Sequence, residues 1–183
     1  MTHNIKYETQ RLVVVPLSEE HIEELRVLRN KNRHFFYATE EISSDQQKKW
    51  FEGYKIKKSE LMFAAYMKNS LNDGPIAFAG IMFTDEDKHI ADCGRMLVNS
   101  EKTQECGIGR ELYSSICMVA FEKCNIEKMI TYIVPGNDRS AKMCRAIGCD
   151  VKSLDDGNSV VTLTKAMLID AVSPKITYLG LIG

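Results

Sequence analysis

The segment LVNSEKTQECGIGR, residues 97–110, decides the fold of this chain. An apolar strand pattern over 89–98 leads into a polar loop, and the loop leads directly into an amphipathic helix over 110–124. Gly107 and Gly109 allow the backbone to turn successive N–H groups inward and to approach a ligand closely. Those N–H groups, with the helix dipole behind them, form an anion site that suits a pyrophosphate. A tight strand-to-helix turn without a ligand is the alternative interpretation.

The residues before this segment predict a strand, two helices and a meander of strands. β-Branched residues end at Pro16, and apolar residues at helical spacing follow the N-cap signal of Ser18. The stretch between the two helices has no clean period and is predicted to be a loop. The predicted elements are a strand over 5–15, a helix over 19–31, a helix from Ser43, and strands over 61–67, 75–83 and 89–98, the last two joined by a hairpin turn at 85–88.

The residues after the segment alternate between strand and helix. An apolar run over 128–134 stops at Pro135, a helix extends from Asn137 to Gly148, and strands over 149–154 and 159–165 follow. A strand–helix–strand order favours locally parallel pairing inside a mixed sheet. The sequence therefore predicts an α/β domain of the α+β kind. Since no linker interrupts the chain, residues 1–183 are expected to form a single domain, with a C-terminal extension over 166–183.

The composition indicates a globular protein and argues against several functional classes. The chain has 183 residues, of which 44% are hydrophobic and 27% charged, and its net charge of -1 lacks the basic excess of a nucleic-acid-binding domain. No run reaches the ~18 apolar residues of a membrane span, and no signal-peptide pattern is present. The six cysteines form no CxxC pair and no zinc-ligand spacing. We therefore expect a cytoplasmic protein with reduced cysteines, no metal, and no nucleic-acid or membrane partner.

Two motifs resemble those of the GNAT superfamily of acyl-CoA-dependent N-acyltransferases. Gln104-x-x-Gly107-x-Gly109 matches the superfamily's Gln/Arg-x-x-Gly-x-Gly/Ala loop. Asn137-x-x-Ser140 with Gly148 eleven residues after the Asn resembles its second motif. The resemblance covers about residues 5–165. It implies a mostly antiparallel central sheet with a parallel pair splayed around the cofactor, flanked by about four helices.

Shorter segments resemble two branches of the superfamily. The opening Glu8-Thr9-Gln10-Arg11-Leu12 with Pro16-Leu17 is similar to the ribosomal-protein N-acetyltransferases. The segments Leu28-Arg29-Asn30, Ile42-Ser43 and Trp50-Phe51 resemble the sugar-nucleotide N-acetyltransferases of pseudaminic acid biosynthesis.

The resemblance implies that acetyl-CoA is the co-substrate. Backbone groups at the end of the strand over 89–98 would pair with its pantetheine arm as though it were an added strand, and the loop N–H groups would hold its pyrophosphate. The residues implied in cofactor binding are Leu97, Val98, Asn99, Gln104, Glu105, Cys106, Gly107, Ile108, Gly109, Arg110, Asn137 and Ser140.

Transfer of an acetyl group from a thioester to an amine requires a base, donors for an oxyanion, and a proton or other stabilisation for the departing thiolate. Asp92, on the strand that leads to the loop, is the candidate base; a structural strand-end partner is the alternative. Cys144 stands where the superfamily usually has Tyr, and Cys149 where it usually has Phe. The Cys144 thiol can protonate the thiolate, or it packs as a small hydrophobe and water, Tyr113 or Tyr132 takes that role.

The resemblance places the acceptor between the first two helices and their loop. Arg29 and Arg33 lie one helical turn apart and can clamp a phosphate, as a nucleotide-sugar requires, whereas core packing is the alternative for Trp50. The candidate substrate residues are Arg29, Asn30, Arg33, Phe35, Phe36 and Trp50.

The reaction expected from these features is direct acetyl transfer from acetyl-CoA to a primary amine of a small molecule such as an amino-sugar nucleotide, without a covalent acyl-enzyme. A monomer or a homodimer is expected. The alternatives are a protein N-terminal acetyltransferase, similar to those of ribosomal proteins, and a catalytically silent acyl-CoA-binding module.

Overall fold

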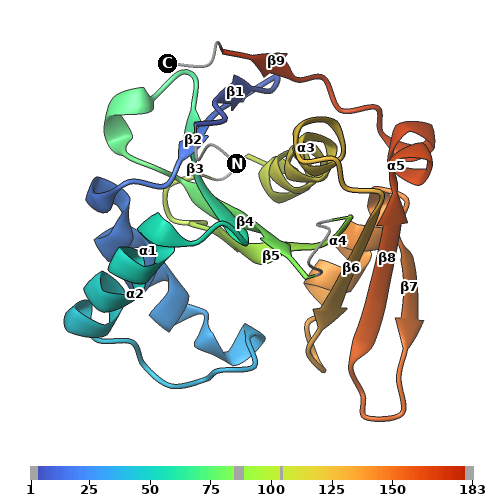
Figure 1. Ribbon diagram of the computed structural model, residues 1–183, viewed down its shortest axis with the longest axis horizontal. Coiled ribbons are helices and arrows are strands. Elements are labelled where there is room, and N and C mark those ends of the chain that lie inside the picture. The colour runs from blue at the N-terminus through green and yellow to red at the C-terminus, as the bar shows by residue number, and fades with distance from the viewer. Residues whose placement is uncertain (1–3, 85–88, 104, 180–183) are drawn as a thin grey trace.

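The computed structural model describes residues 4–84, 89–103 and 105–179. Over these residues the chain forms one open sheet of nine strands with five α-helices beside it (Figure 1). The strands are β1 (Tyr7–Glu8), β2 (Leu12–Pro16), β3 (Glu60–Met67), β4 (Ala77–Phe83), β5 (Ile90–Val98), β6 (Lys128–Ile133), β7 (Asp150–Ser153), β8 (Ser159–Thr164) and β9 (Thr177–Tyr178). The helices are α1 (Ile22–Lys31), α2 (Ser44–Ile56), α3 (Ile108–Lys123), α4 (Asp138–Ala146) and α5 (Lys165–Ala171).

The strand order across the sheet is β7-β8-β6-β5-β4-β3-β2-β1-β9. Only β5 and β6 pair in parallel, and every other neighbouring pair is antiparallel. The predicted mixed sheet is therefore confirmed, with five helices where about four were expected. The predicted hairpin turn at 85–88 lies outside the described residues. No helix within the described ranges is long and apolar enough to cross a membrane.

The strand predicted over 5–15 is in fact two strands. The Thr9 N–H donates to the Leu12 carbonyl over 2.9 Å, and the Leu12 N–H donates to Thr9 Oγ1 over 3.1 Å. These bonds turn the chain back, so that β1 pairs antiparallel with β2. The Thr9 hydroxyl that accepts one of these bonds lies between two runs of strand-forming residues. Strand propensity alone does not predict a turn that a side-chain hydrogen bond stabilises.

The C-terminal extension carries two elements that the sequence patterns did not reveal. α5 buries Leu168 completely, and β9 pairs antiparallel with β1 at Tyr7–Tyr178. The Tyr178 hydroxyl donates to Glu122 over 2.9 Å, and the Lys123 ammonium lies 4.1 Å from the Tyr178 ring centroid. The last strand therefore fastens the end of the chain to its first strand and to α3 (Figure 1).

Capping residues place the starts of the helices close to where the sequence predicts them. Ser18 precedes a 3-10 turn, Glu19–His21, that runs into α1. At α2, Ser43 Oγ accepts from the Gln46 N–H over 3.2 Å and the Ser43 N–H donates to Gln46 Oε1 over 2.8 Å, a reciprocal capping box.

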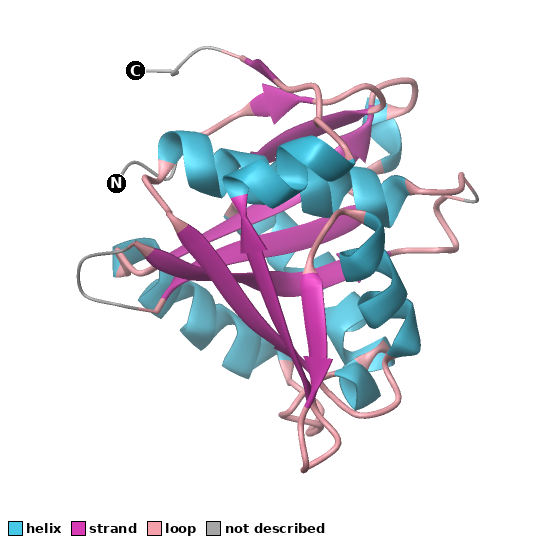
Figure 2. Ribbon diagram, turned by 90° about the vertical axis from the view of Figure 1, so that its right-hand side faces the viewer, coloured by secondary structure: helices cyan, strands magenta, loops and turns pink. Residues whose placement is uncertain are grey.

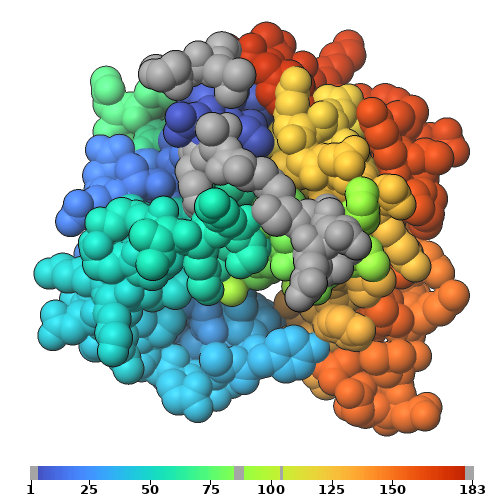
Figure 3. All heavy atoms as spheres, in the orientation of Figure 1, coloured from blue at the N-terminus to red at the C-terminus, as the bar shows by residue number. Residues whose placement is uncertain are grey.

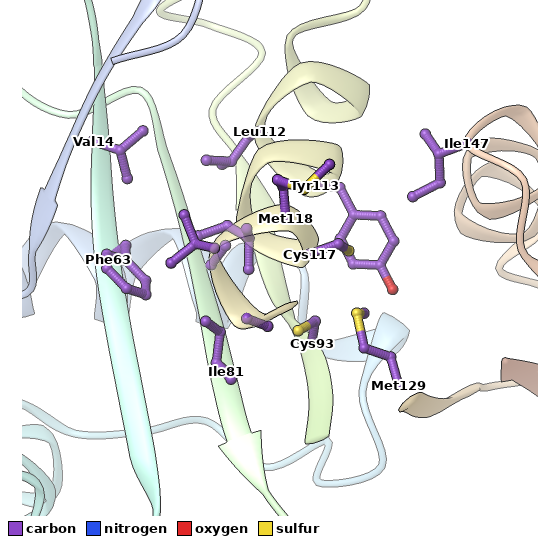
Figure 4. Packing of buried hydrophobic residues seen from close by; sticks show 14 of the residues in the cluster. Val14, Phe63, Ile81, Cys93, Leu112, Tyr113, Cys117, Met118, Met129 and Ile147 are labelled. Atoms are coloured by element: carbon purple, nitrogen blue, oxygen red, sulfur yellow. The ribbon is translucent and has the colours of Figure 1, made fainter. Parts of the chain in front are cut away.

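Helices cover both faces of the sheet (Figure 2). Successive side chains of β3 point to opposite faces, so Leu61 and Phe63 join the core beneath α3, whereas Met62 and Ala64 join the core beneath α1 and α2. The larger core lies between α3, α4 and the sheet. Figure 4 shows Tyr113 and Cys117 of α3 directed toward Cys93 and Met129.

The parallel pair separates soon after it begins. Ile90 pairs with Lys128 and Ala91 with Met129, and no further register joins β5 to β6 among the described residues. The β4–β5 register shifts between Phe78 and Gly80, opposite Arg95, whose φ is 49°. A bulge of this kind bends and twists a strand. Within the part of the chain that the structure describes, the β6-facing edge of β5 consequently has no partner strand over its second half.

Candidate active site

A cavity of about 1170 Å³ opens where β5 and β6 separate. Its walls come from the second half of β5, the end of β6, the starts of α3 and α4, and the region of α1, α2 and the loop between them. Figure 3 shows an opening between the blue segment after α1 and the orange segment of β7 and β8. Most of the predicted site residues line it: Arg29, Phe35, Phe36, Trp50, Asp92, Leu97, Val98, Gly107, Gly109, Arg110, Asn137, Ser140 and Cys144.

Several predicted residues lie outside this lining. Glu105 and Cys106 are exposed next to the glycine loop, Asn99 continues from β5, and Ile108 is buried in the core beneath α3. Gln104 lies outside the described residues. Asn30 and Arg33 also fall outside the cavity wall.

The glycine loop has the backbone geometry that an anion site requires. Gly107 is the N-cap of α3 with a φ of +84°, a left-handed conformation that favours glycine. A Cβ at Gly109 would meet Val98 Cγ2 at 3.6 Å and Met143 Sδ at 3.9 Å, so a larger side chain would enter the space between β5 and α4. The loop therefore presents bare backbone and a helix N-terminus to the cavity, which fits a pyrophosphate.

The second motif caps α4 at the opposite wall. Asn137 Oδ1 accepts a hydrogen bond from the Ser140 N–H over 3.3 Å, and both residues line the cavity. The Asn137 side chain thus defines where α4 begins, and it brings this second helix N-terminus to the same space as the first.

The free edge of β5 forms the floor between these two helix starts. Leu97 and Val98 pair with Phe78 and Ala77 on the β4 side, and no strand pairs with them on the β6 side among the described residues. Asn99 continues the pairing on the β4 side, since its N–H donates to the Ile76 carbonyl over 2.8 Å, and its side chain accepts from the Glu101 N–H. The side of β5 that faces β6 therefore remains available to an extended ligand up to the end of the strand at Val98.

Asp92 places a carboxylate on the cavity wall. Its Oδ1 atom is buried and has no hydrogen-bond partner among the described residues. Burial raises the pKa of Asp92 above its ordinary value, and the nearby Thr131 hydroxyl and Arg95 guanidinium oppose that rise. A carboxylate with a raised pKa and an unused acceptor atom is suited to take a proton from a bound group.

Cys144 lies on the α4 side of the cavity and is 2% exposed. Hydrogen bonds from Cys149 and Tyr113 lower the pKa of the Cys144 thiol, although burial acts in the opposite direction. Burial raises the pKa of Tyr113 well above its ordinary value, so its hydroxyl stays protonated. In Figure 4 the Tyr113 ring extends from α3 with its oxygen in the space between Met129 and Ile147.

Arg29 places a guanidinium group on the acceptor side of the cavity. Its Nη2 donates to the Ala38 carbonyl over 2.5 Å, and its guanidinium lies 3.8 Å from the Phe36 ring centroid. Nη1 is buried and has no hydrogen-bond partner among the described residues. Burial, together with the nearby Arg95 charge, lowers the pKa of Arg29, and the Glu40 carboxylate opposes that shift.

Asn30 and Arg33 shape the acceptor side without lining it. Asn30 Nδ2 donates to the Ile42 carbonyl over 2.8 Å, and Asn30 Oδ1 accepts from the Ile42 N–H over 2.9 Å. Asn30 therefore closes the base of the loop over 32–43. Arg33 Nη1 donates to the Asn30 carbonyl over 3.4 Å. Trp50 does line the cavity, and its ring stacks on Tyr54 at 5.5 Å.

The sequence patterns did not single out Tyr37, which bridges the two sides of the cavity. Its hydroxyl donates to Asn158 Oδ1 over 3.3 Å, which joins the loop over 32–43 to the turn between β7 and β8. Tyr37 and Tyr132 are 67% and 53% exposed and both line the cavity. In the sequence, Tyr37 is marked only by its place in an aromatic loop without periodicity. Its partner Asn158 lies 121 positions away, so a local pattern could not reveal the contact.

The comparison with protein families identifies residues 11–150 as an acetyltransferase (GNAT) domain. A comparison with curated proteins finds no significant sequence match. Solved structures similar to this one include an apo FdhC described as a nucleotide-linked sugar GNAT, with 19% identity, 91% of this chain and 94% of that chain covered, and a TM-score of 0.75.

Two further structures hold coenzyme A. Spermidine N-acetyltransferase from Vibrio cholerae, in complex with CoA and spermine, is 12% identical over 87% of this chain and 98% of its own, with a TM-score of 0.73. The aminoglycoside acetyltransferase AAC(6')-Ib, in complex with CoA, is 16% identical over 88% and 98%, with a TM-score of 0.68. At these identities the likeness shows a shared fold, whereas the family match covers most of the chain. The chain belongs to the GNAT acetyltransferase family and is an acyltransferase.

Proposed function

We propose that this protein transfers an acetyl group from acetyl-CoA to a primary amine of an amino-sugar nucleotide. The observation that carries the acceptor class is the unpartnered, buried Nη1 of Arg29 in a cavity that also holds Asp92. A buried donor on a cation without an acceptor is costly, and an anionic group on the substrate would satisfy it. A nucleotide-linked amino sugar offers phosphate oxygens and an amine in one molecule.

The opposite side of the cavity supports acetyl-CoA as the donor. Backbone N–H groups at the glycine loop, beginning at Gly107, would hold the pyrophosphate, and the free edge of β5 at Leu97 and Val98 would pair with the amides of the pantetheine arm. The start of α4 at Asn137 and Ser140 lies on the far side of the same space. These groups together would direct the thioester toward Asp92.

The chemistry assigned to this site needs only protein groups already present. Asp92 takes a proton from the amine, directly or through water, and leaves it nucleophilic. A strand N–H near Leu97 donates to the carbonyl oxygen of the acetyl group as negative charge develops there, a contribution of about 2.7–4 kcal/mol per donor. The Cys144 thiol, with Tyr113 behind it, provides the proton that the departing thiolate takes up.

The experiment is a thiol-release assay with acetyl-CoA and matched acceptors. We expect turnover with an amino-sugar nucleotide and much weaker turnover with the same amino sugar lacking the nucleotide. The variant Arg29→Met should raise KM for the nucleotide-linked acceptor by about 10- to 100-fold, the usual value of a charged hydrogen bond, and leave the free amino sugar unaffected. Arg33→Met is the matched control, since Arg33 lies on the same segment but outside the cavity wall.

Other outcomes would overturn the proposal in distinguishable ways. Turnover confined to a peptide N-terminus would indicate protein acetylation, and turnover confined to spermidine would indicate a polyamine acceptor. Calorimetric binding of acetyl-CoA without thiol release for any acceptor would indicate a silent binding module.

A further inference from the structure

Arg11 contacts the glycine loop without being part of the cavity lining, and its backbone lies in a hydrogen-bonded turn. The Thr9–Leu12 bonds that separate β1 from β2 close this turn, and the Arg11 carbonyl accepts from the Lys68 N–H over 2.9 Å. Leu12 is completely buried next to it. The backbone from which the Arg11 side chain extends is therefore fixed to the sheet.

The side chain of Arg11 is held in turn by Glu111 on α3. Glu111 Oε2 accepts from Arg11 Nε over 2.7 Å, while its Oε1 accepts from the Arg11 N–H over 2.8 Å and from the Thr9 hydroxyl over 2.6 Å. Burial raises the pKa of Glu111, but these three bonds outweigh it and lower that pKa below its ordinary value. Glu111 is thus an ionised anchor in the first turn of α3, where the helix dipole also favours a carboxylate.

The free end of the guanidinium reaches the glycine loop. Arg11 Nη1 donates to Glu105 Oε2 over 3.1 Å and to the Cys106 carbonyl over 3.1 Å. A Cβ placed on Gly107 would lie 3.6 Å from Arg11 Nη2. The planar guanidinium of Arg11 therefore connects the first turn of α3 with the Glu105 side chain and the Cys106 carbonyl of the loop.

The bond to Cys106 determines where the next N–H points. Cys106 C=O and Gly107 N–H belong to one planar trans peptide, in which the two groups face opposite directions. Because the Cys106 carbonyl points to Arg11, the Gly107 N–H points away from Arg11, and Gly107 itself lines the cavity. Peptide orientation in a glycine-rich loop is otherwise weakly determined, since glycine allows many backbone conformations.

We propose that Arg11 is a positioning residue for the pyrophosphate loop: its guanidinium holds the 106–107 peptide so that the Gly107 N–H faces the donor's pyrophosphate. The proposal rests on acetyl-CoA being the donor but is independent of the acceptor. The charge of Arg11 is shared with Glu105 and Glu111, so its contribution is geometric more than electrostatic.

The test compares two acetyl donors that differ at the pyrophosphate. Acetyl-CoA carries this group, whereas S-acetylpantetheine keeps the thioester and the pantetheine amides but has no phosphate. Arg11→Met should lower kcat/KM for acetyl-CoA by about 10- to 100-fold, mainly through KM, since a small misplacement of a binding group has effects of this size. S-acetylpantetheine should be a poorer donor than acetyl-CoA for the parent protein, and its kcat/KM should be the same in Arg11→Met as in the parent. Arg11→Lys, which keeps the charge but not the planar fork, should recover only part of the loss.

Controls separate this effect from a loss of folding and from a failure of the proposed acceptor. Lys55→Met removes a cation that forms an exposed pair with Glu52 on α2, and it should change neither donor. CoA titration by calorimetry needs no acceptor, so it reports on Arg11 even if the acceptor assignment fails. Unchanged CoA affinity in Arg11→Met, or an equal loss with both acetyl donors, would overturn the proposal. A melting curve for each variant shows whether it is folded at the assay temperature.

Discussion

The environment of Asp92 predicts how activity depends on pH. Activity that requires the ionised carboxylate is present above its pKa and is lost as the pH falls through it. Since burial raises that pKa, the loss should begin at a higher pH than for an exposed aspartate near ~3.9. Thr131→Val removes the hydroxyl that favours the charged form, so the acid limb of kcat/KM should move to still higher pH.

The measurement is a pH profile of kcat/KM at saturating acetyl-CoA for the parent protein, Thr131→Val and Thr131→Ser. The serine variant keeps a hydroxyl and should follow the parent. Asp92→Asn should lower the rate by about 10²- to 10⁴-fold, the usual contribution of a general base. An acid limb that stays in place when the Thr131 hydroxyl is removed would count against Asp92 as the titrating base.

Individual residues differed in how well the sequence could predict their place. The residues of the two motifs, such as Gly107 and Asn137, owe their place to local backbone geometry, and both line the cavity. Arg33 and Asn30 were expected beside Arg29 because all three share one segment, but only Arg29 lines the cavity. Which side of a helix faces a cavity depends on packing with distant elements, and one segment does not contain that information.

Gly148 lies between α4 and β7 and packs against α5, which allows a quantitative prediction about stability. Its φ is +89°, and a Cβ there would lie 2.6 Å from the Met167 carbonyl oxygen and 2.8 Å from Ala171 Cβ. Gly148→Ala should therefore lower the free energy of unfolding by about 2–5 kcal/mol, the sum of left-handed strain and overpacking. Gly136→Ala is the matched control, because Gly136 has a φ of +80° and nothing within 4 Å of the added Cβ.

Thermal or denaturant unfolding of both variants distinguishes the two contributions. Gly136→Ala should cost only the strain, about 1–2 kcal/mol. An equal decrease in the free energy of unfolding of the two variants would mean that the added Cβ at position 148 does not clash with α5.

Helices and strands with regular patterns were predictable, and those that depend on distant partners were not. The caps at Ser43 and Asn137 and the apolar run of β3 are local signals, and the structure confirms the elements that they predict. β9 has only two residues and exists because Tyr178 pairs with Tyr7 across the length of the chain. A strand of that length carries no period, so only the folded molecule reveals it.

The whole molecule should gain stability from its donor. A ligand that binds only the folded state contributes about 2.7 kcal/mol at a concentration of 100 times its Kd. For a protein of this size each kcal/mol corresponds to about 2–4 °C, so CoA should raise Tm by about 5–11 °C. Differential scanning fluorimetry with CoA and with pantetheine at the same concentration measures this shift. A Tm that does not respond to CoA would contradict acetyl-CoA as the donor.

The separation of β5 from β6 also bears on how the protein avoids aggregation. An exposed strand edge is a template on which other chains can add strands, and proteins usually cover or interrupt such edges. Here the β6-facing edge of the second half of β5, which pairs with no strand of the described residues, lies inside a cavity between the starts of α3 and α4. The Tyr37–Asn158 contact joins the two sides of the cavity opening. A narrow ligand that carries amide groups can reach this edge. A strand from another protein molecule is wider, because it has side chains on both faces, and would clash with the starts of α3 and α4. The edge at which acetyl-CoA is proposed to bind is thus shielded from pairing with strands of other copies of the protein.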